Sequence, residues 1–178
     1  VKPIGEDEHK LAMTTYEKYN TAGLRMLAIA QKNEVPDEEH FTISDESNMV
    51  LIGFVGFLDP PKESAKGAVE ALREHGVRTV VLTGDSEGVA LKVCEKVGID
   101  VQTNVLGTDV EQMSDAELKE VAQHCNLFSK LSPMQKKRVV KALQEDGHTV
   151  GYMGDGINDT PALRQSDVGI SVDGAVDI

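Results

Sequence analysis

Acidic and amide side chains cluster around glycines at the end of one apolar stretch. Asp155, Asn158 and Asp159 stand in the run Gly-Asp-Gly-Ile-Asn-Asp, directly after the apolar residues 149–153. Carboxylate oxygens are preferred ligands of Mg²⁺, and glycines let a backbone bend sharply. One carboxylate can bind the cation directly while the other acts through water or orients Asn158. A turn that only caps the next helix is the alternative, but it needs fewer carboxylates.

A second candidate site follows the apolar stretch 78–82. Thr83, Gly84 and Asp85 place a hydroxyl and an unobstructed glycine N–H between a predicted strand and a predicted helix. Such donors at a strand tip and helix N-terminus suit a phosphoryl oxygen. The alternative is a plain strand-to-helix turn in which Asp85 or Ser86 caps the helix.

A lysine occupies the first turn of another predicted helix, residues 133–145. Lys136 lies near the positive end of that helix dipole, which is an unfavourable place for a cation. We interpret it as a lysine held for an anion. A solvated helix face, which Lys137 and Arg138 would share, is an equally good explanation.

From residue 49 onward the hydrophobic period alternates between strand and helix. Strands are expected at 49–58, 78–82, near 105, 126–129, 149–153 and 168–172, and helices at 64–75, 86–97, 115–124, 133–145 and 161–165. This order predicts an α/β fold with a doubly wound, mostly parallel sheet and helices on both faces. Ligands gather at the carboxyl ends of such strands, so the three candidate sites are expected to converge there.

Residues 1–48 form a separate predicted region. It contains one expected helix at 9–19, an apolar run at 24–30 and an acidic, irregular link over 36–47. Because the chain opens at Val1 and stops abruptly at Ile178, we expect it to be a piece of something larger.

Composition excludes several classes of function. The formal net charge of -12 disfavours nucleic acid as a partner. No run approaches the ~20 apolar residues that cross a bilayer. Cys94 and Cys125 lack metal-ligand spacing and are expected to be reduced thiols.

Three motifs, in this order and spacing, carry a family resemblance. Asp59-Pro60-Pro61-Lys62, Thr83-Gly84-Asp85 and the run 153–163 resemble the phosphorylation domain of P-type cation-pumping ATPases, within the haloacid-dehalogenase-like superfamily. Residues 167–177 most resemble the bacterial magnesium-transporting branch. The resemblance implies a haloacid-dehalogenase-like Rossmannoid fold, with 49–178 as an incomplete phosphorylation domain. Residues 1–48 then resemble the C-terminal remnant of the inserted nucleotide-binding domain.

The resemblance implies roles around the phosphoryl group. Thr83 and Gly84 would hold that group, and Lys136 would neutralise its charge. Asp155 would bind Mg²⁺. Asn158 and Asp159 would complete the metal shell and the phosphate contacts.

The resemblance also implies nucleotide contacts, with ATP as the substrate. Arg25 would touch the nucleotide phosphates, Asp85 would lie near the nucleotide, and Asp59 would help join the two domains. Lys130 stands where the family often has arginine, and a lysine cannot make the two-pronged contact of a guanidinium.

The acceptor aspartate of the family is missing from this sequence. Its Asp-Lys-Thr-Gly-Thr motif is absent, and so is the central strand that would carry it. Asp59 is a poor substitute because Pro60 and Pro61 remove backbone donors, and Asp85 is followed by the repelling carboxylate of Glu87. We expect the acceptor upstream of Val1. The chain alone should then be inactive, and it should either close the gap by strand rearrangement or self-association, or represent its parent poorly.

The resulting hypothesis is the cytosolic catalytic segment of an ATP-driven Mg²⁺ transporter in a bacterial inner membrane. Its partners would be ATP, Mg²⁺ and the remaining domains of the transporter: actuator, transmembrane and the rest of the nucleotide-binding domain. A soluble Mg²⁺-dependent haloacid-dehalogenase-like phosphatase is the alternative, but it should contain its own Asp-x-Asp nucleophile. A non-catalytic nucleotide-binding regulator would bind ATP without turnover.

Overall fold

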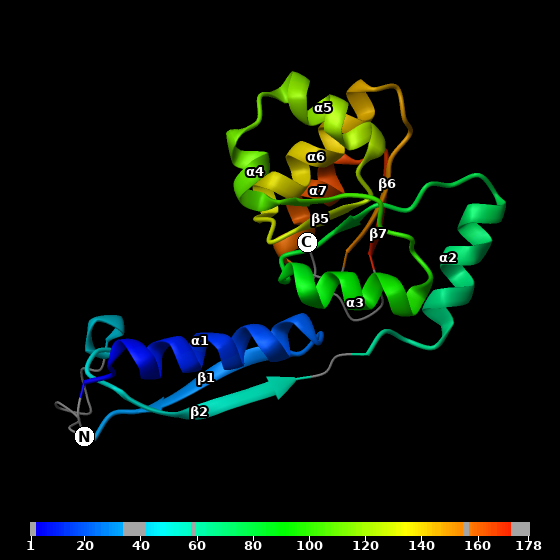
Figure 1. Ribbon diagram of the computed structural model, residues 1–178. Helices are drawn as coiled ribbons and strands as arrows, with labels where there is room; N and C mark the ends of the chain where they lie inside the picture. Colours follow the sequence, from blue (N-terminus) through cyan, green and yellow to red (C-terminus); the bar gives the residue numbers. More distant parts are fainter. Residues whose placement is uncertain (1–2, 34–41, 58–59, 155–156, 172–178) are drawn as a thin grey trace. The chain divides into compact units, whose positions relative to one another are not determined.

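The computed structural model describes residues 3–33, 42–57, 60–154 and 157–171. The chain divides into two compact units, Val1–Pro60 and Pro61–Ile178 (Figure 1). Among the described residues, no helix combines the length and the apolar character that a bilayer crossing requires.

The first unit is a helix beside a two-stranded antiparallel sheet. It comprises α1 (Glu6–Thr21), β1 (Arg25–Gln31), the short 3-10 helix η2 (Ile43–Asp45) and β2 (Val50–Phe57). The strands pair from Arg25 opposite Phe57 to Gln31 opposite Val50, with an irregularity between Ile29 and Ala30. Gly23 is the sole buried residue of the unit's described part, so its apolar side chains stay largely accessible.

The position of β2 differs from the sequence-based division of the chain. We expected the strand 49–58 to begin the second region, whereas β2 pairs with β1 and the compact units divide after Pro60. The physical reason is that an alternating apolar pattern identifies a strand without identifying its partner. The boundary at residue 48 was placed where the hydrophobic pattern changes. Because β2 pairs with β1, the compact units instead divide between Pro60 and Pro61.

The second unit alternates helices and strands as predicted. Its elements are α2 (Ser64–Glu74), β3 (Val81–Leu82), α3 (Glu87–Val97), β4 (Asn104–Leu106), α4 (Gly107–Gln112), α5 (Asp115–His124), β5 (Leu127–Ser129), α6 (Pro133–Glu145), β6 (Gly151–Gly154), η3 (Ile157–Asp159), α7 (Thr160–Gln165) and β7 (Val168–Ser171). The predicted strand 78–82 is observed only at its carboxyl end. The short helix α4 was not predicted because six residues carry too little periodicity.

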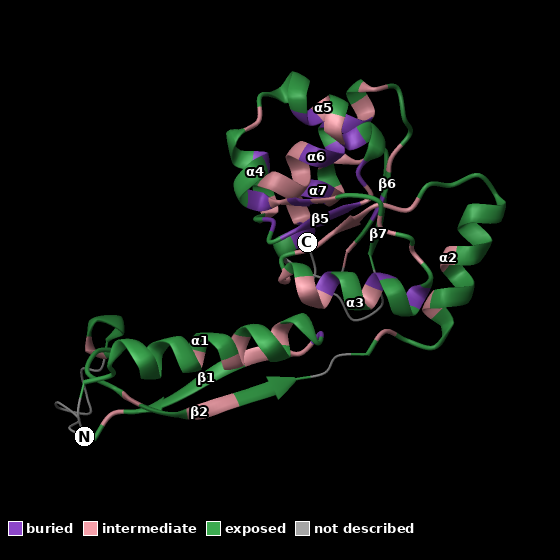
Figure 2. Ribbon diagram, in the orientation of Figure 1, coloured by how far each residue is buried: buried purple, intermediate pink, exposed green. Residues whose placement is uncertain are grey.

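Helices cover both faces of a parallel sheet, which confirms the α/β prediction. β5 lies between β3 and β4, and both pairings are parallel. Consecutive strand residues point to opposite faces. Phe128 therefore packs with α5 and α6, through Leu118 and Val139, while Leu127 packs with α3 through Cys94. In Figure 2 buried positions, drawn in purple, lie on β5 and on the helices around it.

β6 and β7 form a second parallel sheet instead of extending the first one. Within the described residues no hydrogen-bonded ladder joins β3 to β6, and no strand from elsewhere inserts beside either. Side chains bridge the two sheets, because Leu82 of β3 packs in the cluster of Val140, Tyr152 and Ala162. Among the described residues, the predicted single sheet is thus interrupted between β3 and β6.

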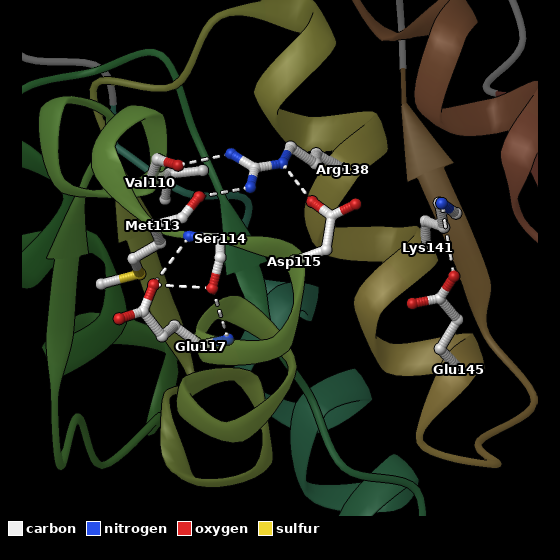
Figure 3. A network of polar contacts seen from close by, with 8 residues as sticks. All are labelled: Val110, Met113, Ser114, Asp115, Glu117, Arg138, Lys141 and Glu145. Carbon is white, nitrogen blue, oxygen red and sulfur yellow. Dashed lines mark hydrogen bonds and ion pairs between the residues drawn. The ribbon is translucent and has the colours of Figure 1, made fainter.

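A guanidinium ties helix α6 to α4, to the start of α5 and to the turn between them (Figure 3). Arg138 donates to the carbonyls of Val110 and Met113, and its Nε lies 2.8 Å from Asp115 Oδ1. The interpretation of Arg138 as part of a solvated helix face is wrong, because these partners lie in α4, in the turn after it and at the start of α5. The contact fixes the first half of α6, where Lys136 lies.

Candidate active site

A nearly buried ion pair joins the start of α6 to η3. Lys136 Nζ lies 2.7 Å from Asp159 Oδ1, and each side chain is 12% exposed. Local sequence signals place the lysine: the Ser132 side chain accepts a hydrogen bond from Gln135 N, and Pro133 occupies the first turn. Lys136 therefore stands in the first turn as predicted, with a carboxylate as its partner.

The carboxylate of Asp159 has a second donor that the sequence analysis missed. Tyr152 OH donates to Asp159 Oδ1 over 2.8 Å, and Tyr152 is 8% exposed. We had interpreted 149–153 only as an apolar strand. The available signal was the tyrosine itself, because a buried phenol hydroxyl needs a partner.

Gly154 allows this carboxylate to lie against the end of β6. A Cβ at Gly154 would stand 2.6 Å from Asp159 Cβ and 2.8 Å from Oδ2, closer than real side chains approach. A glycine is therefore required here by close contact, whereas the sequence analysis expected glycines only for a sharp bend of the backbone. Asn158 lies exposed in η3, and Asp155 lies outside the described residues.

The Thr83 segment forms a compact local turn. Asp85 N donates to Thr83 Oγ1 over 3.0 Å, and Thr83 Oγ1 donates to Asp85 Oδ2 over 3.2 Å. Gly84 is exposed, and Leu131 N donates to Thr83 O over 2.9 Å. These local bonds fit the turn alternative, and the phosphoryl-binding role of Thr83 and Gly84 stays a prediction.

Lys130 is held next to this turn in an uncommon backbone conformation. Its φ is 54°, and its N–H donates to Asp85 O over 2.9 Å. On the other side, a Cβ at Gly107 would collide with Lys130 O, and Gln135 Nε2 donates to Gly107 O over 2.9 Å. A non-glycine residue at positive φ persists only where its surroundings hold it, and functional sites are common places for that.

The second unit thus brings two groups of predicted residues to the ends of its strands. The first group lies after β3 and β5 and contains Thr83, Asp85 and Lys130. The second group is the pair of Lys136 and Asp159. Arg25 lies in β1 of the first unit, so the structure does not relate it to them. Asp59 lies outside the described residues.

The donor set is chemically suited to Mg²⁺. In the described part of the chain no three His, Cys, Asp or Glu side chains gather as a metal site. Mg²⁺ needs fewer, because it keeps several waters and binds through one or two carboxylates plus phosphate oxygens. The carboxylate of Asp159, close to the end of β6 at Gly154, fits that requirement, and Asp155 is its nearest carboxylate neighbour in sequence.

Known proteins resemble this chain over nearly its whole length. A family described as haloacid dehalogenase-like hydrolase matches residues 5–167. The chain is 52% identical over 159 residues to "Magnesium-transporting ATPase, P-type 1" of Escherichia coli strain K12, which covers 89% of the chain and 18% of that protein. It is 46% identical over 178 residues to the protein of the same name from Salmonella typhimurium strain LT2, covering 100% and 20%. A calcium-transporting ATPase of Listeria monocytogenes is 32% identical over 179 residues. The chain spans about a fifth of these relatives' length.

Proposed function

The chain belongs to the haloacid dehalogenase-like hydrolase family, and we propose that it serves a magnesium-transporting P-type ATPase as part of its cytosolic catalytic unit. The observation that carries this proposal is the nearly buried Lys136–Asp159 pair beside the glycine of β6. The relatives that share about half of its residues are named magnesium-transporting ATPases. In this proposal the second compact unit, Pro61–Ile178, belongs to the phosphorylation domain, and the first unit, which includes β2, belongs to the nucleotide-binding domain.

Lys136 and Asp159 divide the electrostatic work of phosphoryl transfer. The Lys136 ammonium supplies positive charge where negative charge develops on the phosphoryl oxygens. Its position is set by Asp159 Oδ1 at 2.7 Å and not by solvent. Asp155 and Asp159 would hold Mg²⁺, with Asn158 beside them. The cation would offset the charge of the phosphate and orient it.

The turn after β3 would receive the phosphoryl group and the nucleotide. The Thr83 hydroxyl and the Gly84 N–H are donors for phosphoryl oxygens. Thr83 and Asp85 bond to each other in the structure, so Thr83 would exchange that partner for phosphate. Lys130, beside Asp85, would approach the nucleotide.

The proposal also includes contacts beyond the second unit. Arg25 would touch the phosphates of ATP, and Asp59 would help to join the two domains. The remaining parts of the transporter, actuator, transmembrane segments and the rest of the nucleotide-binding domain, would be the partners of this chain. The parent would lie in a bacterial inner membrane with this part on its cytosolic side.

The acceptor aspartate would come from another part of the longer polypeptide. The sequence contains no Asp-Lys-Thr-Gly-Thr motif. Within the described residues β3 pairs only with β5, and β6 pairs only with β7, so each keeps one edge that lacks a strand partner. A strand carrying the acceptor between these edges would complete the site, and the chain alone would not hydrolyse ATP.

The test is formation of an acyl phosphate in the full-length transporter that carries this chain. With radiolabelled ATP and Mg²⁺, the wild type should form a hydroxylamine-sensitive phosphoenzyme. Asp155→Ala should abolish it, and Lys136→Ala should lower its rate of formation. Lys137→Ala, the neighbouring lysine on α6, is the matched control. An undiminished phosphoenzyme in Asp155→Ala would refute the proposal.

A second assay separates the transporter from a free-standing phosphatase. The 178-residue chain is incubated with p-nitrophenyl phosphate and Mg²⁺, and no turnover is expected. Hydrolysis by the chain alone that is lost in Asp155→Ala would favour the phosphatase and overturn the claim that the acceptor lies elsewhere.

A further inference from the structure

Tyr152 places a polar group inside an otherwise apolar cluster. Tyr152 is 8% exposed and packs with Val140 and Ala162, while its hydroxyl donates to Asp159 Oδ1 over 2.8 Å. The ring alone could be supplied by phenylalanine. The hydroxyl is therefore the feature that needs an explanation.

The hydroxyl and Lys136 hold the same oxygen from two different elements. Tyr152 approaches Asp159 Oδ1 from β6 and Lys136 approaches it from α6, at 2.8 and 2.7 Å. The other side of the carboxylate, including Oδ2, lies against Gly154. Two donors on one oxygen and a backbone behind the other fix the rotation of the carboxylate.

We infer that Tyr152 is a positioning residue of the phosphoryl-transfer site, whose hydroxyl holds Asp159 in the orientation that serves Mg²⁺. This inference rests on the proposed function. Without the phenol donor, the Asp159 carboxylate is less restricted and can rotate until both oxygens face the Lys136 ammonium. That rotation would turn Asp159 away from a cation and would draw Lys136 away from a phosphoryl group. The hydrogen bonds of Tyr152 and Lys136 to the same oxygen, Oδ1, prevent this rotation.

The expected effect of removing the hydroxyl is a loss of cation affinity with the fold retained. Groups that orient a metal ligand typically contribute about 10- to 100-fold in affinity. Tyr152→Phe keeps the ring in its cluster and removes the donor. Tyr19→Phe, at a tyrosine that is 42% exposed in the first unit, makes the same chemical change away from the site.

The experiment measures Mn²⁺ binding to the 178-residue chain by the electron paramagnetic resonance signal of the free ion. Tyr152→Phe should bind Mn²⁺ about 10-fold or more weakly than the wild type, and Tyr19→Phe should match the wild type. In the full-length transporter, the Mg²⁺ concentration for half-maximal phosphoenzyme should rise by the same factor in Tyr152→Phe. The maximum at saturating Mg²⁺ should stay unchanged, which a merely structural role would not produce.

Other outcomes of these experiments would contradict either the role of Tyr152 or the proposed function. Equal Mn²⁺ affinity in Tyr152→Phe and the wild type overturns the inference, as does a variant that does not fold or a wild type that binds no Mn²⁺ at millimolar concentration. A Tyr152-dependent Mn²⁺ affinity without any phosphoenzyme in the full-length protein would refute the proposed function and leave the positioning role of Tyr152 in place.

Discussion

Breaking the Lys136–Asp159 pair from one side should destabilise the fold as much as removing both of its charges. Lys136→Met removes the cation and leaves a carboxylate in a site where the side chain is 12% exposed, and Asp159→Asn leaves the ammonium in a similar position. Burying a charge whose opposite charge has been removed costs several kcal/mol. The double variant Lys136→Met/Asp159→Asn removes both charges together.

The structure sets the size of the effect. Losing one partner of a buried pair costs about 3–5 kcal/mol. We expect the lower end, about 3 kcal/mol for each single variant, because Tyr152 still donates to residue 159 and the site is not fully dry. The double variant should lose about 3 kcal/mol and not the additive 6, which corresponds to a coupling energy of about 3 kcal/mol. A domain of ordinary stability remains folded under such a loss.

The assay is urea unfolding of the 178-residue chain followed by far-ultraviolet circular dichroism. Lys141→Met on the same helix is the control, because Lys141 and Glu145 form an exposed pair with side chains that are 50% and 47% exposed. Such a pair contributes about 0–1 kcal/mol. Single-variant losses below about 1 kcal/mol, or losses that simply add in the double variant, would refute a desolvated pair. All three site variants should lack normal phosphoenzyme in the full-length protein, which separates stability from activity.

Three further predictions concern stability. Ser114→Ala should cost about 1 kcal/mol and should move the lowered pKa of Glu117 back toward its ordinary 4.5 in an NMR titration, because Ser114 hydrogen bonds hold that pKa down; an unchanged pKa would contradict the cap. The backbone N–H of Val150 lowers the pKa of Asp167 below 3.8. The ionised Asp167 carboxylate therefore stabilises the fold fully above about pH 4, and this stabilisation is lost as the pH falls through the folded-state pKa of Asp167. Asp167→Asn should flatten that acid limb of the unfolding free energy, and an identical limb would disprove the linkage. Leu118→Ala should cost about 3–5 kcal/mol in urea because Leu118 is 0% exposed, and a similar loss in the control Leu91→Ala, at 38% exposure, would contradict this ranking.

Local chemistry made parts of the fold and site predictable. The predicted and observed bounds of α6 are both 133–145, because Ser132 caps the helix and Pro133 begins it. The place of Lys136 in the first turn followed from the same signals. The sequence indicated that the turn after residue 153 needs glycine, but the close contact of Gly154 with Asp159 came from the structure. Each inference depends on a few consecutive residues.

Other features arise from contacts between distant segments, which no local pattern records. The pattern of β2 predicted a strand, but its antiparallel pairing with β1 decided to which compact unit it belongs. Arg138 was indistinguishable in sequence from a solvated helix residue, yet its guanidinium binds the segment before α5.

The sequence by itself determined the chemistry and the elements: an acidic glycine turn after one strand, a lysine at the start of one helix, and alternating α and β segments. The tertiary structure decided how these act together, because the rotation of a side chain depends on donors from other elements. Asp159 illustrates the difference. The sequence indicates a carboxylate suited to a cation, whereas the packing of α6 against β6 places Lys136 and Tyr152 on the same oxygen and so fixes its direction.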